Sequence, residues 1–302
     1  MKCIFFAVLM SCVCASPAFA QVDERVMYAG VVDDQGAPVS GLRVEDFIVR
    51  EDGMAREVLS VEKDEDPLQI ALLVDNSVVM RDKVMDLRRA VGAFVDSLRP
   101  GIQVSLITLA ERPTIVVSYT ADHVLLRRGI ERILSYQAAS TLLDAIVEAS
   151  QGLSKRKEAR SAIAVVTARG PELSYRDYND VIRVVGQAEG TAVHAMVLSG
   201  SEFNDDRFNV QPLFSGDSPE RVAGVGREMA LGLLTRDTGG RYEEVLSMSG
   251  LDMKLQQMAG ELSSQYRVVF ASPQRLIPAK TTEISARDPK LKARGTVVSQ
   301  KN

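Results

Sequence analysis

The side chains of this sequence best suited to chemistry carry oxygen and lie beside apolar segments. Asp75 and Ser77 follow the apolar run 70–74, Ser140 and Asp144 lie at the start of a helical segment, and Thr167 ends another apolar run. Carboxylate and hydroxyl oxygens are the ligands that hard divalent cations such as Mg²⁺ and Ca²⁺ prefer. A divalent-cation site is therefore the first chemistry that these residues suggest.

Other reactive constellations find little support. The only histidines are His123, near the start of a predicted helix, and His194, in an apolar strand where we expect a structural, hydrogen-bonded ring. The sequence contains neither a Gly-x-Ser-x-Gly nucleophile motif nor a phosphate-binding Gly-x-x-x-x-Gly-Lys loop. We therefore predict a protein that is not an enzyme, and a hydrolase using exposed carboxylates is the remoter alternative.

Alternating apolar runs and amphipathic segments must position these side chains. Continuous apolar runs, which are typical of parallel strands covered on both faces, lie at 70–74, 104–109, 162–166 and 192–197. Segments with helical spacing of apolar residues lie at 83–98, 142–153, 177–188, 221–234 and 251–262. This alternation predicts an α/β fold with a doubly wound, mainly parallel, Rossmann-like sheet.

Shorter strands are predicted on both sides of that core. They lie at 26–32, 47–50 and 57–61 before it, and at 266–270, 281–286 and 292–298 after it. The Tyr266 strand is expected to close the main sheet, and the acidic stretch 62–66 is expected to be a linker. We predict an N-terminal β region (21–66), an α/β domain (67–270) and C-terminal strands (271–302), with the two end segments forming one small β domain.

Residues 1–20 have the pattern of a cleaved signal peptide. Lys2 is followed by a short apolar stretch and by Ala18-Phe19-Ala20, a small-x-small cleavage pattern, so the mature chain should begin at Gln21. The alternative, a lipoprotein signal ending at Cys12, is less favoured. All three cysteines lie in this segment. We expect a periplasmic or secreted protein with no lipid anchor, no transmembrane helix and no disulfide.

Charge and composition limit the partners. The formal net charge is −4, and removal of Lys2 with the leader makes it more negative still. No basic cluster with interleaved aromatic residues is present, so nucleic acid is not an expected partner. These features favour a protein or a surface ligand as the partner.

Several motifs occur in the order found in von Willebrand factor type A domains. Asp75-Asn76-Ser77-Val78-Val79 resembles the Asp-x-Ser-x-Ser loop of that family, and 139–145 resembles its Gly-Thr-x-Leu-x-Asp-Ala loop. Thr167-Ala168-Arg169-Gly170 is similar to the end of its Thr-Asp-Gly strand, and Thr238-Gly239-Gly240 to its Thr-Gly-Gly turn. The flanking segments 33–53 and 291–295 resemble those of an exported bacterial subfamily (VWFA-related domain).

The resemblance implies a von Willebrand type A-like fold with a metal-ion-dependent adhesion site, at which Asp75, Ser77 and Ser140 would hold Mg²⁺ or Ca²⁺. The sequence departs from the family because Val79 replaces a serine and Ala168 replaces a carboxylate. Loss of two oxygen ligands predicts a degenerate site, with no cofactor expected.

Three interpretations of the remaining site residues stay open. The site retains a weak cation, or its polar residues only cap helices, or Arg169 or Arg81 pairs with Asp75 in place of a metal. Asp144, in the first turn of its helix, and Arg169 are the other candidates for the ligand-facing loops.

The polar segment 200–220 carries Phe203, Phe208 and Phe214. Long irregular insertions are either functional or mobile, so it is either a solvated loop or a recognition loop whose aromatic residues anchor a partner. We predict a binding module of the cell envelope or extracellular space, and the alternative is a cation-dependent cell adhesion module.

Overall fold

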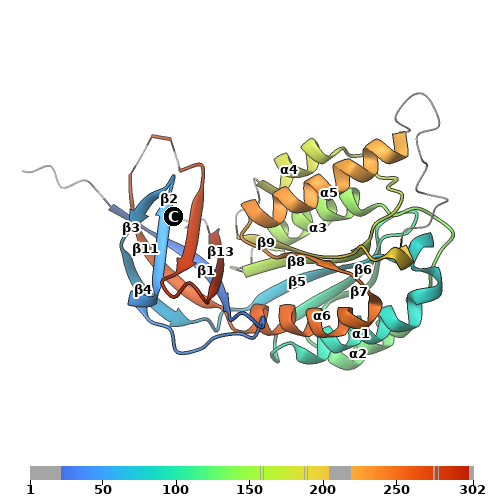
Figure 1. Cartoon of the computed structure of the whole chain (residues 1–302), viewed down its shortest axis with the longest axis horizontal. Helices are drawn as coiled ribbons and strands as arrows, with labels where there is room; N and C mark the ends of the chain where they lie inside the picture. The colour runs from blue at the N-terminus through green and yellow to red at the C-terminus, as the bar shows by residue number, and fades with distance from the viewer. Residues whose placement is uncertain are drawn as a thin grey trace, which may run out of the picture.

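The chain was analysed as a computed structural model (Figure 1). The structure describes residues 22–156, 158, 160–186, 188, 190–203, 219–274, 276–277 and 279–298, with only the backbone described for 22 and 219–225. The proposed signal peptide, Phe208 and Phe214 therefore lie outside the described residues. Within the described part of the chain, no helix is both long and apolar enough to cross a membrane.

A six-stranded sheet forms the centre of the larger part of the molecule. Its strands are β5 (Leu68–Val74), β6 (Gln103–Thr108), β7 (Thr114–Thr120), β8 (Arg160–Ala168), β9 (Thr191–Leu198) and β10 (Tyr242–Val245). The order is β10-β9-β8-β5-β6-β7, and all neighbours are parallel except β6 and the edge strand β7. The prediction of an α/β fold with a mainly parallel sheet is confirmed.

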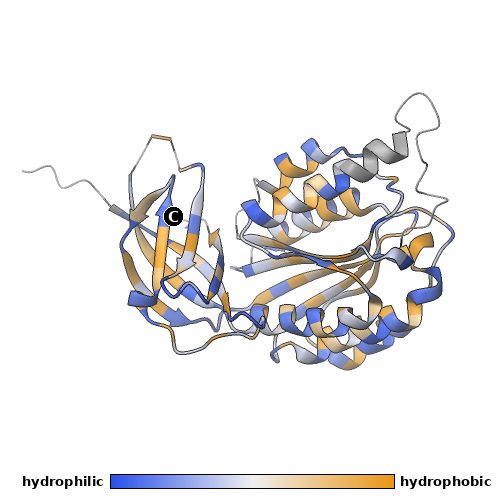
Figure 2. Cartoon of the chain, in the orientation of Figure 1, coloured by the Kyte–Doolittle hydropathy of each residue, from blue (hydrophilic) through white to orange (hydrophobic). Residues whose placement is uncertain are grey.

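Helices cover both faces of this sheet (Figure 1). One face packs against α1 (Val84–Ser97), α2 (His123–Glu131) and α6 (Met248–Ser263), and the other against α3 (Leu142–Arg156), α4 (Tyr178–Gly186) and α5 (Pro219–Asp237). Every residue of β5 and β9 is buried, because helices exclude water from both faces. Hydrophobic and hydrophilic bands alternate along the helices (Figure 2), as one-sided packing requires.

The two ends of the chain form a separate β unit. A four-stranded antiparallel sheet has the order β13-β1-β11-β4, and a three-stranded sheet has the order β12-β2-β3. Their bounds are β1 (Val22–Val32), β2 (Phe47–Glu51), β3 (Met54–Arg56), β4 (Val58–Lys63), β11 (Tyr266–Pro273), β12 (Thr282–Ala286) and β13 (Lys292–Val298). One apolar cluster joins the two sheets, which confirms that the terminal segments pack together.

The strand beginning at Tyr266 does not close the main sheet. β11 instead lies between β1 and β4 in the terminal unit, so the prediction for this strand was wrong. α6 ends at Ser263 and β11 begins at Tyr266, so only Ser264 and Gln265 connect them and the chain passes directly from the helix to the terminal sheet. Apolar residues alone do not say which sheet a strand joins.

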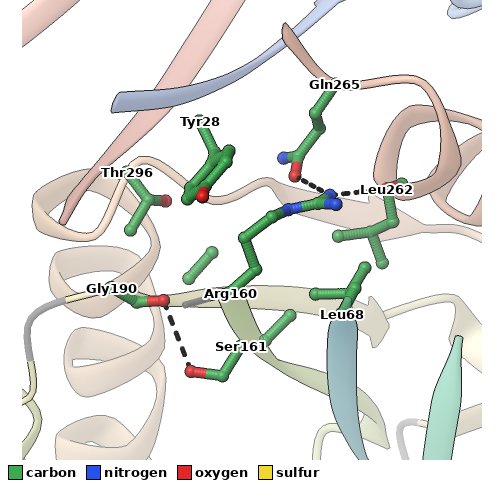
Figure 3. A pocket seen from close by; sticks show the side chains of 10 residues that line it. Tyr28, Leu68, Arg160, Ser161, Gly190, Leu262, Gln265 and Thr296 are labelled. Carbon is green, nitrogen blue, oxygen red and sulfur yellow. Dashed lines mark hydrogen bonds between the residues drawn. The ribbon is translucent and has the colours of Figure 1, made fainter. Parts of the chain in front are cut away.

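The acidic stretch 62–66 is not a free linker, because it forms part of the joint between the two units. Asp64 is buried and pairs with Arg160 at the start of β8, and the Tyr28 hydroxyl donates to Asp66 at 2.5 Å. The Arg160 guanidinium lies 5.1 Å from the centre of the Tyr28 ring and donates to the Gln265 amide oxygen at 2.6 Å (Figure 3). Tyr28, Arg160 and Gln265 line a small cavity at this joint, and their polar atoms hold the two units together.

The Thr-Gly-Gly turn is a second point of this joint. The Thr296 hydroxyl of β13 donates to the Thr238 carbonyl at 2.6 Å. A Cβ on Gly239 would lie 1.8 Å from the Gly295 carbonyl oxygen, and Gly239 has a φ of +70°. Glycine is needed there both for its backbone conformation and for the close approach of β13.

Candidate binding site at the carboxyl ends of the strands

Asp75 ties the loop after β5 to the end of β8. Its side chain is fully buried; Oδ1 accepts a hydrogen bond from the Ser77 amide at 2.9 Å and Oδ2 accepts one from the Thr167 hydroxyl at 2.6 Å. The Asp75 amide also donates to the Val166 carbonyl at 2.8 Å. Both carboxylate oxygens therefore already have partners within the protein.

Ser77 and Ser140 are buried, but their hydroxyls have no hydrogen-bond partner among the described residues. Ser77 precedes the 3-10 helix η2 (Val78–Lys83) without a side-chain cap, and it is the Thr141 hydroxyl, not that of Ser140, that bonds to the Leu109 carbonyl. The interpretation that these two serine side chains only cap helices is therefore wrong. They lie at the positions where the family resemblance places cation ligands.

Hydrocarbon fills the two positions at which the sequence lacks oxygen ligands. Ala168 is fully buried, and Val79 packs so closely on the next loop that a Cβ on Gly170 would lie 2.7 Å from its Cγ1 atom. A cation at this point would meet methyl groups on two sides, and aliphatic groups cannot coordinate it. Among the described residues, no group of three or more His, Cys, Asp or Glu side chains could hold a metal ion.

A buried ion pair that the sequence analysis did not single out lies beside this loop. Arg227 of α5 is 1% exposed; its Nη2 donates to the Ala168 carbonyl at 2.8 Å, and its Nη1 lies 3.8 Å from Oε2 of Glu172. Burial raises the pKa of Glu172 to about 7, and the charge of Asp75 acts in the same direction, whereas Arg227 opposes them. The loop that lacks a carboxylate thus has a guanidinium as its neighbour.

The burial of Arg227 could have been predicted from the sequence. It lies three, four and seven residues before Ala230, Leu231 and Leu234, all of which are buried against the sheet. That spacing places an arginine on the apolar face of a helix, where a charged side chain needs a partner. Its partner Glu172 is 55 positions away in the chain and could not be identified from spacing alone.

Several polar atoms around this pair have no hydrogen bond within the described residues. They are Nε and Nη1 of Arg227, Oε2 of Glu172 and the hydroxyls of Ser77 and Ser140. Such buried groups are normally satisfied by water or a bound polar group. The site is therefore a buried polar cluster that combines guanidinium and hydroxyl donors with a carboxylate acceptor.

Neither arginine proposed as a partner for Asp75 reaches it. The Arg169 guanidinium pairs with Glu228 at 3.2 Å and with Glu244 at 3.0 Å, and Arg81 bonds to the side-chain oxygen of Gln137. The hypothesis that Arg169 or Arg81 replaces a metal beside Asp75 was wrong, because acidic or amide groups nearer to each of them take up its donors.

Asp144 fixes a neighbouring loop. Its carboxylate accepts hydrogen bonds from the amides of Tyr175 at 2.9 Å and Arg176 at 3.2 Å, and it pairs with the Arg176 guanidinium at 3.6 Å. The Leu173 amide donates to the Ser140 carbonyl at 2.8 Å. These bonds hold the loop in one conformation while Leu173 and Tyr175 are 59% and 101% exposed.

Two further predictions can be compared with the structure. Phe203 is buried in the 3-10 helix η3 (Ser201–Phe203) and packs into the core, so it cannot anchor a partner as expected. His194 is fully buried as predicted, but neither ring nitrogen has a hydrogen-bond partner among the described residues, so the expected satisfied ring is wrong. Burial lowers the pKa of His194 to about 4.

Comparison with known proteins supports the resemblance that these loops carry. The sequence profile described as von Willebrand factor type A domain matches residues 70–170, from β5 to the loop after β8. Over this third of the chain, the sequence is similar to a von Willebrand factor type A domain. No curated protein sequence matches the chain.

Several solved structures are similar to this chain at low sequence identity. BatB from Bacteroides thetaiotaomicron has a TM-score of 0.47 and 18% identity, over 65% of this chain and all of that one. The mussel byssus protein PTMP1 has a TM-score of 0.49 and 12% identity, over 71% of this chain but only 50% of that one. A von Willebrand factor type A protein from Catenulispora acidiphila has a TM-score of 0.46 and 10% identity, over 94% and 74% of the two chains.

Proposed function

We propose that this type A domain protein is a non-enzymatic binding module for a protein or surface ligand, acts in the periplasm or outside the cell, and needs no metal ion. The observation that carries the metal-free part is the Arg227 guanidinium, bound to the Ala168 carbonyl beside Glu172. It supplies a positive charge at the loop where an adhesion site would otherwise place a cation. Hydrocarbon at Val79 and Ala168 supports the same proposal.

The binding surface in this proposal includes the exposed side chains beside the buried polar cluster. Leu173 and Tyr175 project from a loop that Asp144 and Ser140 hold in place. A loop that is already ordered loses little conformational entropy on binding, and tyrosine is enriched among residues that contribute most to protein interfaces. The buried network would thus position a rigid contact surface.

Thermal melts of the exported protein test the metal-free part. An ion that binds only the folded state must raise the melting midpoint by mass action. We expect the same midpoint in EDTA and in millimolar Mg²⁺, Ca²⁺ or Mn²⁺. A rise that disappears in an Asp75→Ala variant would show that the site around Asp75 binds a cation, and the metal-free proposal would then be wrong.

Site-specific photocrosslinking in the producing cells tests the binding surface. A photoreactive phenylalanine derivative at Tyr175 should give a discrete adduct, and excess unlabelled protein should compete for it. The matched control is the same probe at Leu276, which is equally exposed but lies in the terminal unit. Equal labelling from both positions, or none from Tyr175, would argue against this surface.

The second candidate function is cation-dependent adhesion through a weak site. The observation in its favour is that the Ser77 and Ser140 hydroxyls are buried and without hydrogen-bond partners next to Asp75. Water could complete the coordination of a small cation there. The metal titration above distinguishes the two candidates, because only this one predicts binding that EDTA abolishes.

A further inference from the structure

The strand β7 is an open edge of the main sheet. It pairs with β6 on one side, and no strand in the described part of the chain pairs with its other side. Its outward amide and carbonyl groups are therefore available to another extended chain. The two register shifts in this pairing lie between β6 and β7 and do not cover the outer edge.

The residues of β7 lack the charged side chains that usually protect a free edge, although Pro113 precedes the strand and two register shifts interrupt its pairing with β6. Natural edge strands commonly carry charged side chains that prevent association, but the segment 113–121 contains no charged residue, in a chain of which 25% is charged. Exposed apolar side chains lie on β7 itself and at the start of the helix that follows it: Ile115 is 63% exposed and Val124 is 60% exposed. An uncharged, β-prone edge of this kind is expected to be covered in solution.

The sequence around β7 is complementary to itself. Complete antiparallel overlap of this seven-residue strand with its own copy places a two-fold axis at the middle residue, Val117. Thr114 then lies opposite Thr120 of the second copy, and Arg112, which precedes the strand, lies at the same end as Asp122 of that copy, the N-cap of α2. Arg112 has no acidic partner among the described residues, so this register would supply an opposite charge at each end of the strand pair.

We propose that β7 pairs with β7 of a second copy of this chain, so that the two six-stranded sheets form one continuous sheet across a symmetric dimer. A two-fold interface uses the same surface on both subunits, which is what a self-complementary strand offers. One strand pair with a few apolar side chains is a small interface, so the dimer should be weak and should depend on protein concentration.

Light scattering coupled to size-exclusion chromatography tests this proposal on the exported protein. We expect monomer at low micromolar concentration and dimer at high micromolar concentration. Ser118→Lys places a positive charge on the exposed edge, close to its counterpart across the axis, and should abolish the dimer. The matched control is Ser249→Lys, which makes the same change at an exposed position on α6 and should leave the dimer unchanged.

A second variant tests the register and does not alter the strand itself. Arg112→Glu, in an exposed loop, would face Asp122 of the second copy with a like charge and should weaken the dimer at least several-fold, whereas Arg112→Lys should not. Protein that remains monomeric at every concentration would overturn the proposal. A dimer that persists in Ser118→Lys would place the interface elsewhere, and a dimer indifferent to Arg112→Glu would exclude the register centred on Val117.

Discussion

Arg227 of α5 donates from Nη2 to the main-chain oxygen of Ala168 at 2.8 Å, and thereby joins a helix to the end of a central strand. The guanidinium is buried together with Glu172, its acidic neighbour. Removal of one member of a buried charge pair leaves the other without compensation, which is usually more harmful than replacement of both.

The first prediction concerns this pair. Arg227→Met should lower the free energy of unfolding by about 3–5 kcal/mol, because Glu172 is left buried without its partner. The double variant Arg227→Met/Glu172→Gln should be more stable than the single variant, as measured by urea denaturation. Arg236→Met, at an exposed position of the same helix, should have no measurable effect. An unchanged free energy of unfolding in Arg227→Met would mean that the Arg227–Glu172 pair does not stabilise the loop after β8.

The second prediction is a pH dependence due to Glu172. Its folded pKa of about 7 lies above the ordinary value of 4.5, so the folded state binds the proton more tightly. This contribution to stability is complete below about pH 4.5 and is lost as the pH rises towards 7. Glu172→Gln should therefore remove a decrease in unfolding free energy over this range, measured by urea titrations at fixed pH. Identical pH profiles for the two proteins would contradict it.

The third prediction concerns His194, whose effect on stability changes with pH in the opposite direction to that of Glu172. Its pKa is lowered to about 4 by burial, although Glu261 nearby opposes the shift, whereas Arg294 and Arg241 reinforce it. Its stabilising contribution is complete above about pH 6.5 and is lost as the pH falls towards 4. His194→Leu should remove this loss and leave stability at pH 7 equal or higher, because the imidazole has no hydrogen bond to lose. Strong destabilisation at pH 7 would reveal a partner for the ring.

The fourth prediction concerns the joint between the two units. Gly239→Ala should lower the free energy of unfolding by more than about 2 kcal/mol, because the added methyl group meets the Gly295 carbonyl and φ is positive. Gly232→Ala is the matched control: its Cβ meets nothing within 4 Å, and it should stabilise the helix by about 0.5–1 kcal/mol. Guanidinium denaturation of both variants gives the comparison. Equal stability of the two would mean that β13 does not approach Gly239 so closely.

The fifth prediction concerns export. Cleavage after Ala20 would leave Gln21 as the first residue and would remove all three cysteines. The intact mass of the protein recovered from the periplasm or the medium should match residues 21–302, with no free thiol detected by a maleimide reagent. Ala20→Leu should slow cleavage, because a large residue replaces a small one at the cleavage site. A mass increased by lipid on Cys12 would indicate the alternative signal.

Local patterns predicted most of the α/β fold. The run 70–74 identified β5, and the spacing of Leu87, Val91 and Phe94 identified α1, because burial on two faces or one imposes those patterns directly. The strand β7 escaped prediction although Thr114–Thr120 is rich in residues that favour strands. The Tyr266 strand was assigned to the wrong sheet because its burial pattern fits either one.

The candidate site could be predicted only in part. Loop motifs located Asp75, Ser77 and Ser140, and the structure places these residues near the carboxyl ends of β5 and β8. The charge that accompanies them comes from Arg227 and Glu172, which no local motif connects. Charge compensation depends on which side chains lie close together in space, and spacing along the chain does not show this. The sequence therefore suggested that an arginine replaces the metal, but it indicated the wrong arginine.

The pairing of β1 with β11 and β13 has a consequence for how the chain reaches its native state. Val22 is paired with Pro273 and Val26 with Val298, so both neighbours of β1 are formed by residues made more than two hundred positions later. A chain that emerges amino end first must keep β1 unpaired until almost all of it has emerged. Contacts so distant in sequence slow folding and leave strand edges exposed meanwhile. The terminal unit should therefore be the last part to become resistant to proteases. Its assembly should be the folding step that depends most on a holding chaperone.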